Sequence, residues 1–145
     1  MNKIIMSLLI LALSLCLAAF GGTTDSADIH YTNSIKFSEA EINAAIEIVL
    51  ADFSKAKAYR NCILTKLWYD ESESNRWVKS YMTYGRGGIN GINEDNVIII
   101  QAHFDVGKKA DIYFNPPSTV TNWHWILIRN SVTDKWVKDD AGWSR

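Results

Sequence analysis

The sequence lacks most of the features that reveal a function directly. Its 145 residues carry 15 basic and 16 acidic side chains, so no excess of positive charge points to a nucleic-acid partner. It contains no nucleophile elbow, no His-Glu-x-x-His zinc motif and no closely spaced cysteine pair. The run Gly85-Arg86-Gly87-Gly88 lacks the spacing of a dinucleotide-binding loop. We therefore expect neither a cofactor nor a metal ion.

A long apolar run stands at the start of the chain. Residues 4–20 are almost wholly apolar, they follow one basic residue, and Ala19-Phe20-Gly21 is the best match to a cleavage site. This layout predicts a secretory signal peptide over residues 1–21 and a mature protein that is secreted or held in the cell envelope. Two alternatives would keep it at the membrane: an uncleaved signal, or a lipid on Cys16. Leu15 argues against the lipid, because a lipoprotein signal places a small residue before its cysteine.

Cysteine is scarce as well. Removal of residues 1–21 leaves Cys62 as the only cysteine, so no disulfide can form within the mature chain. Cys62 lies in an apolar segment, and we expect a small buried side chain there.

The best-signalled element is a helix over residues 39–57. Ser38 and Glu41 have the spacing of a capping box. One stripe of apolar residues follows at helical spacing: Ile42, Ala45, Ile46, Val49, Phe53 and Ala56. This helix can cover one face of a sheet. The preceding segment, 22–36, is polar and without periodicity, so we expect a flexible lead-in.

The middle of the chain predicts two further strands and a second helix. In order, the elements are a strand at 60–70, a helix at 73–84, a mobile glycine-rich loop at 85–96, a strand at 97–106 and a loop at 107–119. On the second helix, Trp77, Tyr81 and Tyr84 share one face.

The last part of the sequence predicts a β-hairpin rich in tryptophan. Along residues 121–130, Trp123 and Trp125 alternate with His124 and Ile126. Both faces carry large apolar groups, as expected of an inner strand covered on two sides. A polar turn leads to a more charged strand from residue 135, which we expect nearer the sheet edge.

Helices combined with hairpin-connected strands predict an α+β fold. We expect one domain over residues 37–145, with the long N-terminal helix packed in a curved antiparallel sheet of about four strands.

Three segments carry a resemblance to known proteins: Phe37-Ser38-Glu39-Ala40-Glu41-Ile42, Asn122-Trp123-His124-Trp125-Ile126-Leu127-Ile128-Arg129 and Lys135-Trp136-Val137-Lys138-Asp139. Over residues 35–143 the chain resembles an uncharacterised domain family of small exported proteins of Gram-positive bacteria, many of which look like lipoproteins. Its ending also resembles the last strands of the cystatin-like and nuclear transport factor 2-like superfamily. That resemblance implies a cone-shaped fold with a pocket between helix and sheet. Such folds host enzymes, scaffolds and ligand binders, so no activity is implied.

Few reactive side chains come together in the sequence. His103 and Asp105 lie two positions apart on one expected strand and so point to the same face, while His124 lies on a strand expected nearby. These side chains suit zinc binding or acid–base catalysis if Asp105 and His124 share a face. Alternatively, each hydrogen-bonds a backbone group at a strand end. His103 and Asp105 are therefore weak catalytic candidates.

Aromatic side chains supply the candidate binding residues. Trp68, Trp123 and Trp125, with the strand amide Gln101, would line an apolar ligand site in a pocket fold. The alternative is that these aromatic side chains are ordinary core.

Three functional hypotheses are consistent with these features of the sequence. The leading hypothesis is a non-enzymatic exported module that binds a small molecule or a protein. The second is a pocket-type hydrolase or isomerase that uses Asp105 or His103. The third is an inhibitor or immunity-type protein that blocks a partner through residues 85–96.

Overall fold

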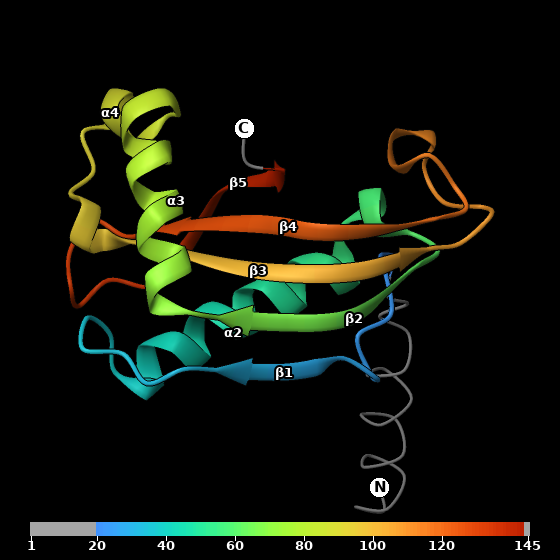
Figure 1. Ribbon diagram of the computed structural model, residues 1–145, viewed down its shortest axis with the longest axis horizontal. Coiled ribbons are helices and arrows are strands. Elements are labelled where there is room, and N and C mark those ends of the chain that lie inside the picture. Colours follow the sequence, from blue (N-terminus) through green and yellow to red (C-terminus); the bar gives the residue numbers. More distant parts are fainter. Residues whose placement is uncertain (1–19, 144–145) are drawn as a thin grey trace, which may run out of the picture.

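The computed structural model describes residues 20–143, so the predicted signal peptide lies outside the described residues except for its last two positions. The fold is α+β, as predicted: three α-helices accompany a five-stranded mixed sheet (Figure 1). In chain order the elements are β1 (Asp28–Tyr31), α2 (Glu39–Lys55), β2 (Cys62–Tyr69), α3 (Glu71–Tyr84), α4 (Gly87–Asn90), β3 (Val97–Val106), β4 (Ser118–Ile128) and β5 (Val137–Trp143), with short 3-10 helices at Lys57–Tyr59, Glu94–Asn96 and Ile112–Phe114. Within residues 20–143, no helix has the length and apolar character needed to span a bilayer.

The predicted capping box starts α2. Ser38 Oγ accepts from the Glu41 amide at 3.2 Å, and the Ser38 amide donates to the Glu41 carboxylate at 2.7 Å. The predicted apolar stripe is buried from Ile42 to Phe53, whose ring lies 6.3 Å from that of Trp125, whereas Ala56 is half-buried. The helix ends at Lys55, because Ala56 is already extended.

The sheet has the order β1-β2-β3-β4-β5, and only β1 is parallel to its neighbour. The expectation of about four antiparallel strands was therefore one strand short. The extra strand lies in the segment expected to be a flexible lead-in, where β1 pairs with Lys66–Tyr69 on the edge of β2. Backbone pairing holds this strand in the sheet, and most of its side chains are exposed. Its sequence therefore lacks the alternation of apolar and polar residues that predicts a strand.

Several other boundaries differ from expectation. β4 begins at Ser118, inside the predicted loop 107–119, and ends at Ile128. The helix predicted from residue 73 begins at Glu71, because Asp70 caps it by accepting from the Glu73 amide at 2.8 Å. The expected mobile loop 85–96 contains α4 and a 3-10 turn. The return strand of the hairpin begins at Val137. The predicted strand over residues 97–106 is confirmed as β3.

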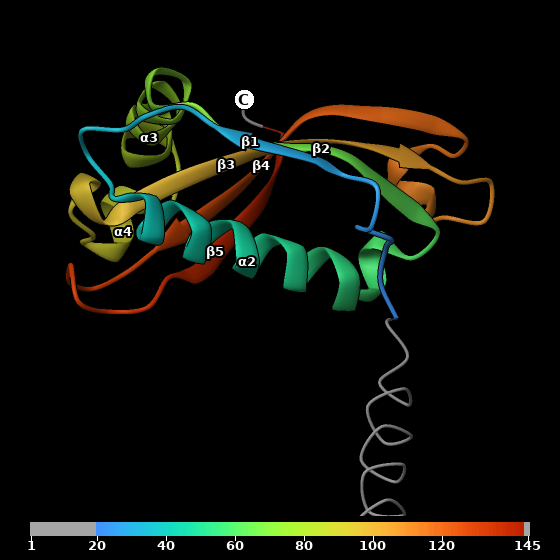
Figure 2. The same ribbon diagram turned by 90° about the horizontal axis from the view of Figure 1, so that it is seen from below.

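The two faces of the sheet are covered unequally. Figure 2 shows α2 along one face, with α3 on the other face at one end only. The α2 side holds the main core, in which Trp125 and Phe104 have no exposed area. The α3 side holds a smaller cluster of Val78, Tyr81, Val97 and Ile99. Beside α3, part of the sheet therefore lacks a helical cover.

Candidate functional site

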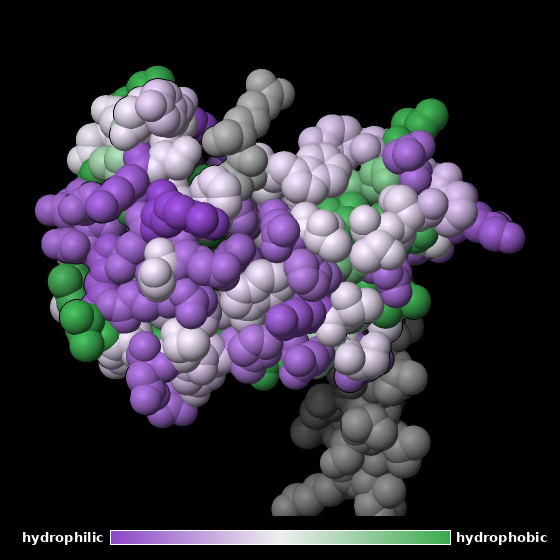
Figure 3. Space-filling view, viewed as in Figure 1, coloured by the Kyte–Doolittle hydropathy of each residue, from purple (hydrophilic) through white to green (hydrophobic). Residues whose placement is uncertain are grey.

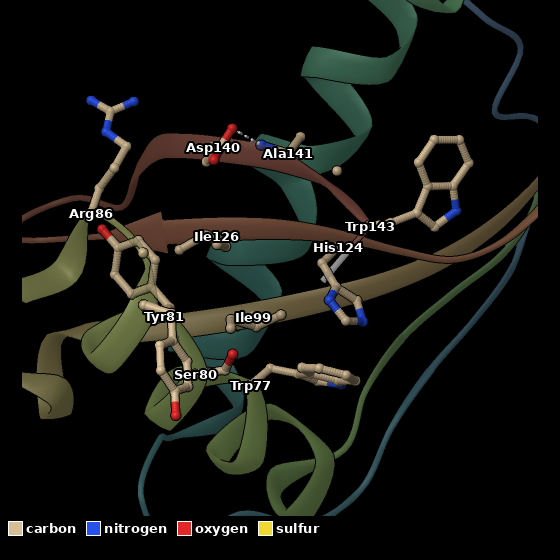
Figure 4. A pocket seen from close by; sticks show the side chains of 13 residues that line it. Trp77, Ser80, Tyr81, Arg86, Ile99, His124, Ile126, Asp140, Ala141 and Trp143 are labelled. Carbon is tan, nitrogen blue, oxygen red and sulfur yellow. Dashed lines mark hydrogen bonds between the residues drawn. The ribbon is translucent and has the colours of Figure 1, made fainter. Parts of the chain in front are cut away.

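A cleft of about 270 Å³ lies between α3 and strands β4 and β5, and we call it the α3 cleft. Figure 4 shows its lining side chains from close by. It is bounded by Trp77, Ser80, Tyr81, Tyr84, Gly85 and Arg86 of α3 and the following turn, Ile99 of β3, His124 and Ile126 of β4, and Asp140, Ala141, Gly142 and Trp143 of β5. Its walls are mostly aromatic and aliphatic, with charged groups only from Arg86 and Asp140.

One row of paired residues crosses the sheet beneath the cleft. Trp68 of β2 pairs with Gln101 of β3, which pairs with His124 of β4, which pairs with Gly142 of β5. Paired residues project to the same face of a sheet, so this row faces α3. Gln101 and His124 are each 3% exposed, and the Gln101 Nε2 atom lies 3.3 Å from His124 Nε2. The floor of the cleft therefore contains a buried polar pair.

Trp77 leans over this floor from α3. Its ring centroid lies 4.7 Å from that of His124, and the Arg76 guanidinium lies 4.7 Å from the indole centroid. Two buried atoms near His124 have no hydrogen-bond partner among the described residues: Trp77 Nε1 and Gln101 Oε1. Buried polar atoms almost always have a hydrogen-bond partner, so two unpaired atoms beside one cleft are unusual.

His124 is held in its neutral form. Burial is the main cause that lowers its pKa, to about 4, and the positive charge of Arg76 lowers it further. Both causes oppose the imidazolium, so the ring stays uncharged at neutral pH. The cleft floor is consequently polar without carrying charge.

Gly142 leaves a gap in the cross-sheet row. A Cβ placed on Gly142 would meet no atom within 4 Å. Glycine inside a strand commonly marks a place where a bulge or another group comes close to the backbone. Here the missing side chain opens the cleft next to His124.

A buried network fastens β5 to the end of α3. Tyr81 donates its hydroxyl to the Asp139 carboxylate at 2.7 Å, and Arg86 lies 3.4 Å from the other oxygen of that group. The Asp139 side chain is 7% exposed. Burial raises the pKa of Tyr81 to about 12, so its hydroxyl remains a donor. This network sets the width of the cleft at its Arg86 end.

The predicted catalytic candidates lie elsewhere on the same face. His103 Nδ1 accepts from the Asn122 amide at 3.1 Å, and its ring packs 4.7 Å from that of Trp68. Asp105 accepts from the Thr119 hydroxyl at 2.9 Å. Neither residue lines the α3 cleft. Within residues 20–143, no group of three His, Cys, Asp or Glu side chains is placed to hold a metal ion.

The predicted binding residues divide between the two faces. Trp123 and Trp125 belong to the core on the α2 side, where the Trp125 indole donates to Asp52 at 2.9 Å. Trp123 also lines a second hollow of about 430 Å³ there, beside Tyr59 and Phe114. Trp68 lies in the cross-sheet row but donates to Glu73 at 3.1 Å, away from the cleft lining. Gln101 alone lies beneath the cleft, as the partner of His124.

Sequence reasoning missed Trp77 and Gly142 as site residues. Trp77 was recognised only as part of a helical face. A signal for Gly142 is present in the sequence, because it interrupts a strand that otherwise carries larger side chains.

No family model, curated protein or solved structure matches this chain.

Proposed function

We propose that this protein is a non-enzymatic binding module that takes a small molecule into the α3 cleft. One observation carries the proposal: an apolar concavity opens over a buried polar pair, at a point where Gly142 omits a side chain. Small-molecule sites typically combine apolar walls with a few well-placed polar groups. The lining of this cleft has that composition.

The volume of the cleft supports a ligand of one or two rings. An apolar cavity of about 150 Å³ is large enough to bind benzene. The α3 cleft, at about 270 Å³, has room for a bicyclic molecule or for the ring of a larger ligand.

The groups in the cleft favour binding over catalysis. Catalysis by a nucleophile and a base needs the two side chains within about 2.6–3.2 Å of each other. The side-chain partner of His124 is the amide of Gln101, which is not a nucleophile. The alternative catalytic pair, His103 and Asp105, hydrogen-bonds to neighbouring strand residues outside the cleft.

The surface around α3 supports a small ligand more than a large protein partner. On the side shown in Figure 3, hydrophobic residues form separate small patches among hydrophilic ones. Large contiguous apolar patches are the usual mark of a protein-binding surface. A protein partner, including one blocked through residues 85–96, therefore takes second place in the proposal.

We further propose that the protein works outside the cytoplasm and is related to the small exported family named above. The apolar residues 4–20 support export, and the tryptophan-rich ending supports the relationship. The proposed cleft lies on the opposite face of the sheet from α2, so it is not the helix-lined pocket that the cystatin-like resemblance implies.

The test is an NMR titration of the purified protein with indole. We expect chemical-shift changes at the methyl groups of Ile99 and Ile126 and at the amide of Gly142. The Gly142→Leu variant should abolish these changes, because a Cβ at this position meets no atom within 4 Å and the rest of the leucine side chain would occupy the open space. Thr121→Leu, an exposed position on β4, is the matched control and should bind indole normally. Equal binding by Gly142→Leu would overturn the proposal.

A further inference from the structure

We propose that the ligand of the α3 cleft is an uncharged aromatic compound whose ring carries a hydrogen-bond acceptor such as an amide carbonyl. The ring takes the place of the missing side chain at Gly142, and the acceptor faces the N–H groups of Trp77 and His124. This inference rests on the proposed function and names the chemical class that the site selects.

The shape of the cleft selects a flat ring. Directly paired residues on one sheet face lie about 4.5–5.5 Å apart, so a group above Gly142 is a direct neighbour of the His124 imidazole. Trp77 already packs against His124, with ring centroids 4.7 Å apart, so the ligand lies beside this pair and not between the two rings. A planar aromatic ring in that place can pair with the indole or the imidazole at the favourable centroid distances of about 4.5–7 Å.

The hydrogen-bond donors of the cleft select an acceptor. Gln101 Nε2 is always a donor, so its contact with His124 Nε2 makes that nitrogen the acceptor and leaves the ring proton on Nδ1. Trp77 contributes a second N–H, which has no partner among the described residues. Trp77 Nε1 is covered, so the proposal requires the indole to rotate when the ligand binds. His124 Nδ1 and Trp77 Nε1 then donate to the ligand carbonyl.

The electrostatics of the cleft exclude a charged ligand. Arg86 is engaged by the carboxylate of Asp139 at 3.4 Å, and it is the cation of the cleft lining. Asp140 contributes a negative charge at the rim, and His124 remains neutral. A carboxylate entering this space would lose hydration, and the charge of Arg76, which reaches His124 from outside the cleft lining, would offset only part of that cost. An ammonium would face the same loss beside the N–H donors.

The first test compares three probes with the same ring: benzamide, toluene and benzoate. Each is titrated into the purified protein at pH 7 while the Gly142 amide is followed by NMR. We expect benzamide to bind with a Kd on the order of 1 mM, as suits so small a molecule. Toluene should bind about fivefold more weakly, because it lacks the acceptor. Benzoate should bind at least about tenfold more weakly than benzamide.

The second test removes the donor. Trp77→Phe keeps an aromatic ring but deletes Nε1, so the preference for benzamide over toluene should fall to about half or less of its original value. Trp123→Phe is the matched control, because Trp123 Nε1 is likewise buried without a partner among the described residues, but the ring belongs to the core on the other face of the sheet. It should leave the preference unchanged.

The outcomes separate the two proposals. If toluene or benzoate binds as tightly as benzamide, or if Trp77→Phe keeps the full preference, the ligand class is wrong while the cleft remains a binding site. If none of the three probes shifts the Gly142 amide, the proposed function itself fails.

Discussion

Gly142 lies directly opposite His124 in the β4–β5 ladder, so the buried imidazole has no side chain beside it on β5. On its other side, His124 is paired with Gln101. The row of side chains across the sheet thus has no member on β5, and α3 lies over the space that this leaves. A single glycine, placed next to a buried polar pair, opens the α3 cleft at this point.

The neutral state of His124 predicts a specific dependence of stability on pH. Its folded pKa, about 4, lies below the unfolded value of about 6.5, so the unfolded chain binds a proton first as the pH falls. The free energy of unfolding should therefore decrease below pH 6.5 and level off below pH 4. Between pH 7 and pH 5 this residue should account for a loss of about 2 kcal/mol.

Urea unfolding at the two pH values measures this loss. The His124→Gln variant keeps an uncharged polar partner for Gln101 and should lack this contribution. If the wild type and the variant lose the same stability between pH 7 and pH 5, His124 is not buried in its neutral form.

Ser74 is expected to be essential for the docking of α3 on the sheet. The Ile99 amide donates to Ser74 Oγ at 3.1 Å, and Ser74 is 1% exposed. The pairing between β2 and β3 ends at Trp68 and Gln101, so β2 offers Ile99 no partner. Ser74→Ala should lower the free energy of unfolding by about 1–3 kcal/mol, because it leaves a buried N–H unpaired.

Hydrogen exchange at the Ile99 amide reports on the same contact and should become faster in Ser74→Ala. Ser72→Ala, an exposed position on the same helix, should change neither quantity appreciably. An unchanged exchange rate in Ser74→Ala would contradict the assigned role.

Tyr81 should hold β5 against the end of α3. Tyr81→Phe leaves the buried Asp139 carboxylate without its shortest hydrogen bond, and the expected cost is about 1–3 kcal/mol in thermal or urea unfolding. Tyr84→Phe provides a matched control, since Tyr84 is 87% exposed and its hydroxyl should contribute less than about 0.5 kcal/mol. Similar stability losses in the two variants would contradict a special role for Tyr81.

Much of the fold could be predicted because its signals are local. The capping box of Ser38 and Glu41 fixes the start of α2, and the alternation along residues 97–106 fixes β3. The inner position of β4 follows from large apolar groups on both of its faces, and the charge of the last strand places it at the edge. The four-residue strand β1 was not predicted from the sequence. It is held by backbone pairing to a distant segment, so its own side chains show no pattern typical of a strand.

The site was harder to predict because it depends on what lies across the sheet. The tryptophans of β4 pack in the core under α2, where Trp123 also borders a second hollow, and neither lines the α3 cleft. The cleft instead arises from the register that places Gly142 next to His124 and from the way Trp77 of α3 overhangs both. Neither the register nor the docking of α3 can be obtained from the spacing of residues within one segment.

A crystal structure of the protein soaked with benzamide tests the central claim most directly. The account predicts a ring in the space above Gly142, beside the packed pair of His124 and Trp77, with its carbonyl oxygen about 2.7–3.2 Å from one of the two N–H groups. An empty α3 cleft in crystals where benzamide is bound at another surface would contradict it.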